Sequence, residues 1–299
     1  MTVGDLDREL AFYTGVLRFE LVGRRATRRG AADDFFGLPR SETRSVELRL
    51  GEEHVTLTEH LTNKGLPIGR FAEQLITGFS IAIVVRDMDA AYRHLREQGI
   101  RHVSTGPQTL PGWNQSAGGI RAFYFTPRPG RSCRNHLVSG RRKAIRSGSS
   151  LKDGMFLGID HTAVKSVPIR GAVSVYRDRL GMRLAGAAEE THGPEQEHLN
   201  QVFGARLRIT ALRAPRGPGI ELLEYLAPPG GRARPVTTKA SDLIFWHTDV
   251  RLDRFEAFVP TNWDGLQLVS KAIACSTAQN YPTPPVLILD PDGHALRLE

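Results

Sequence analysis

The sequence is poor in cysteine and has no long hydrophobic run. Its two cysteines, Cys133 and Cys275, are single and far apart, so they form neither a paired metal-binding motif nor a disulfide framework. A reducing, cytoplasmic location is therefore expected. No apolar stretch is long enough to cross a bilayer, and no signal peptide is recognised before the first structured segment, so we expect a soluble protein with no membrane partner.

Acidic residues are missing between Arg128 and Lys152, a stretch that carries eight basic residues. The formal net charge of the whole chain is +8, so the remainder is about neutral. The stretch also lacks aromatic residues, which single-stranded nucleic-acid-binding surfaces usually place among their basic ones. Its Gly-, Ser- and Arg-rich composition favours a poorly ordered basic linker at residues 128–153 over a nucleic-acid-binding patch.

What the chain does contain is a short unit that recurs four times. Residues 158–186 predict a strand, a helix with Val173, Tyr176 and Leu180 on one face, and a second strand after Gly181. The same pattern ends at Gly23 near the N-terminus, at a constant offset of 163 and without a gap. Weaker copies occupy residues 80–104 and 247–259. A chain of 299 residues with this repeat is long enough for two domains.

Further strands are expected after the helices, because apolar and polar residues alternate there. These strands lie at residues 45–50, 54–60, 120–125, 203–212, 219–226, 286–289 and 294–299. After Phe125 the alternation stops, so the closing strand of the second unit is taken to be lost. The predicted fold class is α+β, with four βαβββ units.

Several motifs resemble one known superfamily. The helix ends FYTGVL and VYRDRLGM, the strand IELLEYL and the closing segment DPDGHALRL are similar to the vicinal oxygen chelate superfamily, the glyoxalase, bleomycin-resistance and extradiol-dioxygenase group. The resemblance implies that two units pair into an open cup that holds a divalent metal, with ligands from the first and last strand of each unit. We expect one cup at residues 1–127 and a second at residues 154–299.

The resemblance also implies a ligand set in the C-terminal cup. His161 and His247 match the first-strand positions, and Glu221 matches one last-strand position. Arg297 stands where the superfamily has a glutamate, and Glu299 lies two residues further along the same face. Such nitrogen and oxygen donors suit one Zn, Fe, Mn or Ni ion. The alternative to a metal site is a structural role, in which the histidines are hydrogen-bonded core residues and Glu221 is a solvated strand residue.

The N-terminal cup is expected to carry no ligands, because Thr56 and Ser80 occupy its matched positions. The sequence favours a metal-dependent enzyme acting on a small molecule with adjacent oxygens, either a glyoxalase-like lyase or isomerase or a dioxygenase. In this interpretation Arg297 binds an anionic group of the substrate. The alternative is a metal-free protein that sequesters a small ligand, as bleomycin-resistance proteins do. No nucleic-acid partner is expected, and a homodimer is a further possibility.

Overall fold

The computed structural model describes residues 1–27, 35–67, 79–115, 117–126, 133–139, 154–166, 170–185, 189–228, 237–253, 265–270 and 285–299. Four structural units with the same strand order make up these residues. In each unit the first strand lies next to the last and parallel to it, and the third and second strands follow in antiparallel pairing. The α+β fold with four repeated units is therefore confirmed. Among the described residues, no helix is long and apolar enough to traverse a membrane.

The bounds of the elements follow the four units along the chain. Unit 1 contains β1 (Thr2–Val3), α1 (Leu6–Ala11), the π-helical turn η1 (Phe12–Val16), β2 (Glu20–Thr27), β3 (Thr43–Leu50) and β4 (Glu53–His60). Unit 2 contains β5 (Phe79–Val85), α3 (Met88–Glu97), β6 (Arg101–His102), β7 (Gln108–Thr109), β8 (Arg121–Thr126) and β9 (Cys133–Ser139). Unit 3 contains β10 (Phe156–Ser166), α4 (Arg170–Ser174), η3 (Val175–Arg179), β11 (Arg183–Leu184), β12 (Glu189–Thr191), α5 (Pro194–Asn200), β13 (Arg206–Arg213) and β14 (Gly219–Ala227). Unit 4 contains β15 (His247–Val250), β16 (Gln267–Leu268), β17 (Val286–Leu289) and β18 (Ala295–Leu298).

The repeat is visible in the helices as well as in the strands. The turns η1 and η3 keep the sequence offset of 163, and each buries a tyrosine, Tyr13 or Tyr176, to 1% exposure. In unit 2 the side chain of Asp87 caps α3 by accepting hydrogen bonds from two backbone N–H groups. Gly99, at a φ of +65°, follows this helix, and Gly181, at +68°, follows the corresponding helix of unit 3.

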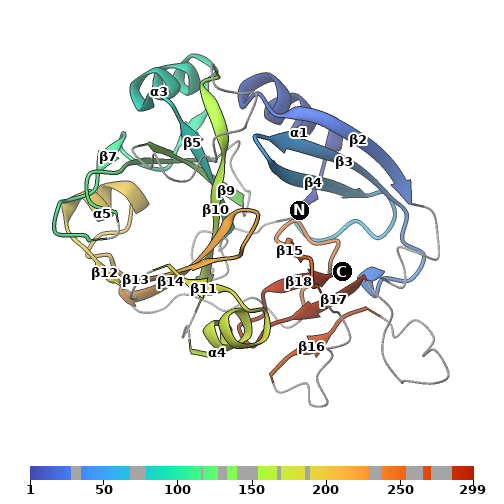
Figure 1. Ribbon diagram of the computed structural model, residues 1–299. Helices are drawn as coiled ribbons and strands as arrows, with labels where there is room; N and C mark the ends of the chain where they lie inside the picture. Colours follow the sequence, from blue (N-terminus) through green and yellow to red (C-terminus); the bar gives the residue numbers. More distant parts are fainter. Residues whose placement is uncertain are drawn as a thin grey trace.

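The pairing of the units differs from the expected one. Strand β5 of unit 2 pairs antiparallel with β10 of unit 3, which joins these two units into one 10-stranded sheet (Figure 1). Units 1 and 4 form two 4-stranded sheets that meet where the backbone N–H of Thr2 donates to the carbonyl of Phe245, at 3.0 Å. We expected units 1 and 2 to form one cup and units 3 and 4 the other. This pairing is wrong, because unit 2 pairs with unit 3. Here units 2 and 3 are called the central cup, and units 1 and 4 the terminal cup.

The closing strand that was taken to be lost is present. Strand β9 lies inside the stretch expected to be a linker, between β5 and β8, and completes unit 2. Side chains of this strand alternate between two buried faces. His136 and Val138 lie on one face, and Leu137 packs in the core on the other. The neighbouring basic residues obscure this alternation in the sequence. The remainder of the expected linker, residues 128–132 and 140–153, lies outside the described residues.

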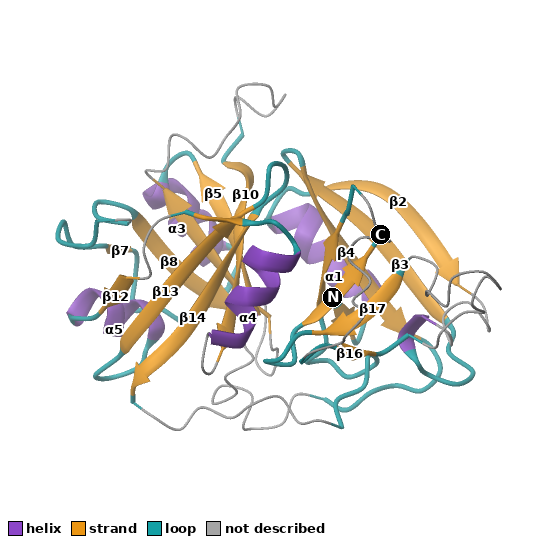
Figure 2. Cartoon of the chain, turned by 60° about the horizontal axis from the view of Figure 1, so that its bottom comes forward, coloured by secondary structure: helices purple, strands orange, loops and turns teal. Residues whose placement is uncertain are grey.

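One large core connects all four units. It includes Tyr13 and Leu48 of unit 1, Ile83 of unit 2, Tyr176 of unit 3 and Leu296 of unit 4. The two cups lie side by side, and Figure 2 shows α4 between them. Gly171 of α4 packs against Pro291 of unit 4, where an added Cβ would lie 3.0 Å from the proline ring. Strand β5 is buried along its whole length and apolar except for Ser80, because one of its faces lies in this core and the other faces the interior of the central cup.

Candidate functional site

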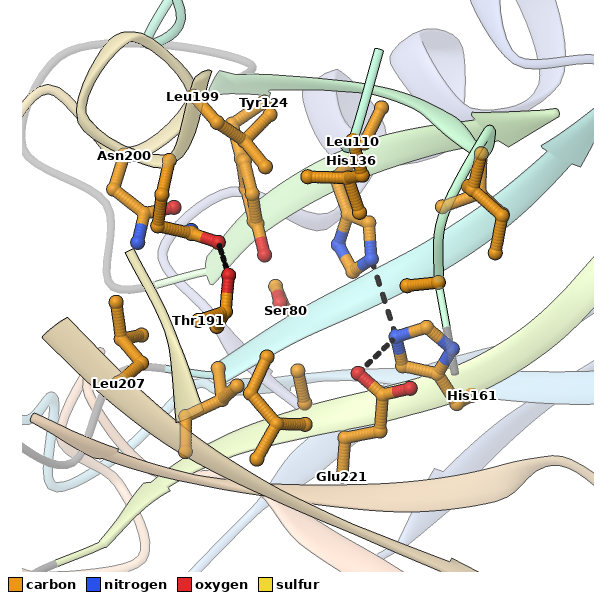
Figure 3. A pocket seen from close by; sticks show the side chains of 18 of the residues that line it. Ser80, Leu110, Tyr124, His136, His161, Thr191, Leu199, Asn200, Leu207 and Glu221 are labelled. Atoms are coloured by element: carbon orange, nitrogen blue, oxygen red, sulfur yellow. Dashed lines mark hydrogen bonds and ion pairs between the residues drawn. The ribbon is translucent and has the colours of Figure 1, made fainter. Parts of the chain in front are cut away.

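The central cup encloses a cavity with a volume of ≈ 90 Å³ between units 2 and 3. Its walls are largely apolar and include Leu110, Ile120, Ala163, Leu199, Leu207 and Leu223. Polar side chains gather at its two ends. His136, His161 and Glu221 lie at one end, while Thr191 and Asn200 lie at the other (Figure 3). This volume has room for several water-sized groups, at about 10–15 Å³ each.

The strand register explains why the three side chains at the first end converge. His161 lies opposite Ala82 of β5, and Ser80 lies opposite Ala163 of β10, so Ser80 and His161 are related by a local two-fold axis. In the parallel pairings, Ala82 lies opposite His136 and Ala163 lies opposite Glu221. Two of these positions lie on first strands, at Ser80 and His161, and two lie on last strands, at His136 and Glu221. They are the equivalent positions of the two paired units.

His161 is the centre of this group. Its Nε2 lies 3.2 Å from Nε2 of His136 and 3.1 Å from Oε2 of Glu221 (Figure 3). On its other side, Nδ1 lies 2.7 Å from Oδ2 of Asp160. The His161 side chain is 4% exposed and that of Glu221 is 12% exposed. Burial is the largest influence on the pKa of His161 and lowers it, but the adjacent Glu221 and Asp160 carboxylates outweigh this effect and raise the pKa.

The sequence-predicted site residues fall into two separate places. The structure brings His161 and Glu221 together in the central cup, on neighbouring strands. It places His247, Arg297 and Glu299 in the terminal cup, on or next to β15 and β18. The expected set of His161, His247, Glu221 and Glu299 is therefore not one site, because units 3 and 4 are not paired with each other.

In the terminal cup, His247 and Arg297 are engaged with neighbouring side chains. Nε2 of His247 lies 3.3 Å from Oδ1 of Asp249, and burial lowers the pKa of this histidine. Arg297 forms ion pairs with Asp249 at 3.4 Å and with Glu299 at 2.7 Å, and its guanidinium lies over the ring of Phe35. Arg297 does not line the central cavity, and its role in binding an anionic group of a substrate stays a prediction.

The interior of the terminal cup also differs from that of the central cup. It contains an apolar cluster built from Leu38, Ala240, Phe245, Leu287 and Ala295, with Phe35 and Phe36 packed against them. The rings of Phe35 and Phe245 lie 6.2 Å and 6.1 Å from the ring of His247. The equivalent position in the terminal cup is therefore surrounded by aromatic side chains.

His136 is the site residue that the sequence analysis missed. It is 3% exposed and packs against Tyr124, with ring centroids 4.6 Å apart. It comes from β9, in the stretch interpreted as a linker. The sequence pattern that could have predicted β9 is the alternation in the segment CRNHLVS. This segment follows β8 in the chain, where the last strand of a βαβββ unit is expected.

The arrangement defines a class of protein, one with paired βαβββ units and a cup that presents histidine and carboxylate side chains from first and last strands. Residues 1–121 match the sequence profile of the Glyoxalase/Bleomycin resistance protein/Dioxygenase superfamily. This match shows that residues 1–121 are similar to that superfamily, and the likeness of the rest of the chain concerns the fold.

Two solved structures resemble the whole chain. A point mutant of glyoxalase I from Zea mays has a TM-score of 0.60 and 16% sequence identity, and the match covers 99% of this chain and 90% of that one. A putative dioxygenase from Bacillus subtilis has a TM-score of 0.55 and 14% identity, with 99% and 82% of the two chains covered. At these identities the likeness concerns the fold alone. No curated protein matches the sequence.

The donors at the first end of the cavity suit a divalent cation in their chemistry. Two imidazole nitrogens and one carboxylate oxygen suit Zn, Fe, Mn or Ni. Ligand atoms that share a cation at about 2.0–2.2 Å lie roughly 2.8–3.6 Å apart, depending on the coordination angle, and the two contacts to His161 measure 3.2 Å and 3.1 Å. The three side chains form a chain through His161, and among the described residues no group of three or more His, Cys, Asp or Glu side chains is already arranged as a metal site.

Proposed function

We propose that the protein is a divalent-metal-dependent enzyme that acts on a small molecule with adjacent oxygens in the central cup. His136, His161 and Glu221 hold the cation in this proposal. The observation that carries it is the convergence of these three side chains, from the first and last strands of two paired units, at one end of a buried cavity. The cation, when bound, supplies a Lewis acid that polarises the oxygens of the substrate.

The remaining walls of the cavity account for substrate selection. The apolar side chains of Leu207 and Leu223 contact the carbon skeleton and keep water out. At the far end, Asn200 donates a hydrogen bond to the hydroxyl of Tyr225 at 3.1 Å, and Thr191 donates to Gln196 at 2.7 Å. These groups orient a polar substituent on the substrate. Both the lyase or isomerase reaction and the dioxygenase reaction remain open, and oxygen consumption with Fe²⁺ distinguishes them.

The test is metal binding by calorimetry, with Zn²⁺, Mn²⁺, Ni²⁺ and, under anaerobic conditions, Fe²⁺. Wild type is expected to bind one ion of at least one of these metals per chain. His136→Ala and His161→Ala are expected to lower the affinity at least about tenfold, or 1.4 kcal/mol. His247→Ala is the matched control, because this partly buried histidine belongs to the terminal cup. Wild type that binds no metal, or His161→Ala that binds as wild type does, overturns the proposal.

A second candidate function is metal-free binding of a small ligand. Two observations favour it. Ser80 occupies the fourth of the equivalent positions, and a serine hydroxyl is a weak ligand for these cations. His161 also contacts both His136 and Glu221 directly, without a cation between them. A small molecule that binds equally well to wild type and His161→Ala supports this second function.

A further inference from the structure

Asp160 and His161 are successive residues of β10, yet their side chains are hydrogen-bonded. Successive residues of a regular strand point to opposite faces of the sheet. Here Ile159 lies opposite Ile83 and His161 lies opposite Ala82, so Asp160 is an extra residue in the register between β10 and β5. This irregularity is a β-bulge, which redirects side chains locally. It allows Oδ2 of Asp160 to approach Nδ1 of His161 to 2.7 Å.

Arg213, at the end of β13, fixes the position of Asp160. Its Nη2 donates to both carboxylate oxygens at 3.1 Å, and its Nη1 donates to the backbone carbonyl of Asp160 at 2.7 Å. The Asp160 side chain is 0% exposed, whereas that of Arg213 is 26% exposed. A buried carboxylate needs such a partner, because an unpaired buried charge is costly.

Gly219 on β14 supplies the space that this arrangement requires. It lies opposite His161 in the parallel pairing. A Cβ at this position would lie 2.8 Å from both Cζ and Nη1 of Arg213. Any side chain at residue 219 would therefore displace the guanidinium from Asp160. Three features from three strands, the bulge, the arginine and the glycine, thus converge on one carboxylate.

We propose that the Arg213–Asp160 pair is a positioning device that holds His161 in one tautomer and one orientation. With a cation in the site, Nδ1 of His161 carries the proton and donates to Asp160, which leaves the lone pair of Nε2 for the cation, at the end of the cavity where His136 and Glu221 lie. A carboxylate behind an imidazole also makes the ligating nitrogen more basic. This inference rests on the proposed function, because it assigns Asp160 a role toward the cation that His161 would hold.

The test combines metal affinity with a direct measurement of the tautomer. Co²⁺ affinity is measured by calorimetry and by the visible spectrum of the bound ion, and the protonation of the two His161 nitrogens is read by ¹⁵N NMR of the metal-free protein at alkaline pH. Asp160→Ala is expected to lower Co²⁺ affinity by about 10–100-fold and to remove the preference for Nδ1–H. Asp160→Asn retains an acceptor for Nδ1–H, so it is expected to keep the tautomer and lose part of the affinity.

Gly219→Ala and Arg208→Gln complete the design. Gly219→Ala leaves Asp160 and His161 in place and is expected to weaken Co²⁺ binding by displacing Arg213. Arg208, which also lies on β13, pairs with Glu224 at 3.0 Å and does not line the cavity, so Arg208→Gln is expected to bind Co²⁺ within about twofold of wild type. If Asp160→Ala fails to fold, Asp160→Asn and Gly219→Ala carry the test.

The possible failures are distinguishable. Wild-type Co²⁺ affinity in Asp160→Ala and Gly219→Ala, with the tautomer of His161 unchanged, overturns the inference and leaves the proposed function intact. A wild-type protein that binds no Co²⁺ and none of the other metals overturns the proposed function. In that case the NMR measurement on the metal-free protein alone tests whether Asp160 positions His161. If the His161 tautomer in Asp160→Ala is the same as in wild type, the positioning role is overturned.

Discussion

The Nε2 atoms of His136 and His161 lie 3.2 Å apart, although one histidine comes from the last strand of unit 2 and the other from the first strand of unit 3. This contact depends on the antiparallel pairing of β5 with β10, which places the two units in one sheet. With each half of the chain folded as its own cup, His161 would have faced His247 instead. The neighbour of His161 therefore follows from the way the four units are paired.

The equivalent position at Ser80 predicts a gain of affinity. Ser80 is 6% exposed, lines the cavity and is the two-fold equivalent of His161. Ser80→His adds a third imidazole to the donor set, so we expect Co²⁺ to bind at least about tenfold more tightly, or 1.4 kcal/mol. Ser80→Ala is the control and is expected to bind within about twofold of wild type. A folded Ser80→His protein with unchanged or weaker affinity contradicts this prediction.

The terminal cup is expected to resist conversion into a metal site. Arg297→Glu introduces the residue type that the resemblance implies at this position, but it puts a third carboxylate beside Asp249 and Glu299. We expect a loss of about 1–3 kcal/mol in the free energy of unfolding and no increase in the number of metal ions bound. Denaturant unfolding and metal analysis check the two parts. Arg297→Gln, which removes the cation without adding an anion, is the control and is expected to lose less stability.

The stability of the fold is expected to depend on His60 in mildly acidic solution. Burial lowers the pKa of His60 from 6.5 to about 4, and the charge of the N-terminus acts in the same direction. Between these two pH values the unfolded chain binds a proton that the folded protein does not, so stability falls as the pH falls from 6.5 to about 4. At about 1.4 kcal/mol per pH unit, the loss due to His60 amounts to about 3 kcal/mol.

Unfolding experiments at several pH values check this expectation. In His60→Gln, the difference in unfolding free energy between neutral and acidic solution is expected to shrink by that amount. His192→Gln, at an exposed histidine, is expected to retain the wild-type pH profile. A His60→Gln protein with the same acid dependence as wild type would show that other groups cause it.

The pairing of the units predicts that the two halves of the chain stay together after a single cut. A protease site inserted between residues 140 and 153 separates units 1 and 2 from units 3 and 4 in the covalent chain. The halves share the β5–β10 pairing, the Thr2–Phe245 hydrogen bond and one continuous core. We expect the cut protein to elute as one species of native size and to separate only in denaturant. Two independently folded fragments would contradict the pairing described above.

Much of the fold could be predicted from local patterns. The helix that begins after Asp87 and ends before Gly99 has a capping side chain and a left-handed glycine as its signals. The alternation in residues 45–60 predicted β3 and β4, because one face of each strand is more buried than the other. By contrast, β9 was missed, because arginines in and around it masked the alternation that places His136 inside the cup.

The site could be predicted only in part. His161 and Glu221 lie on the adjacent, parallel strands β10 and β14 of one unit, so their proximity depends on the internal topology that every unit repeats. His247 was assigned to the same site because it holds the matching position in the next unit along the chain. That assignment required a pairing between units 3 and 4 that the fold does not make.

The sequence by itself determined the four repeated units, except for the last strand of unit 2, and its resemblance to a known superfamily pointed to His161 and Glu221 as first-strand and last-strand positions of unit 3. These depend on short-range effects: helix caps, glycine conformations and the alternation of apolar residues. Only the tertiary structure decided which units face each other and which of the equivalent positions share a cavity. Every unit has its first strand at the same place in the strand order, so the choice of partner rests on how a core of residues from distant parts of the chain packs as a whole. The same packing left a cavity beside His136, His161 and Glu221 and placed phenylalanine rings next to His247.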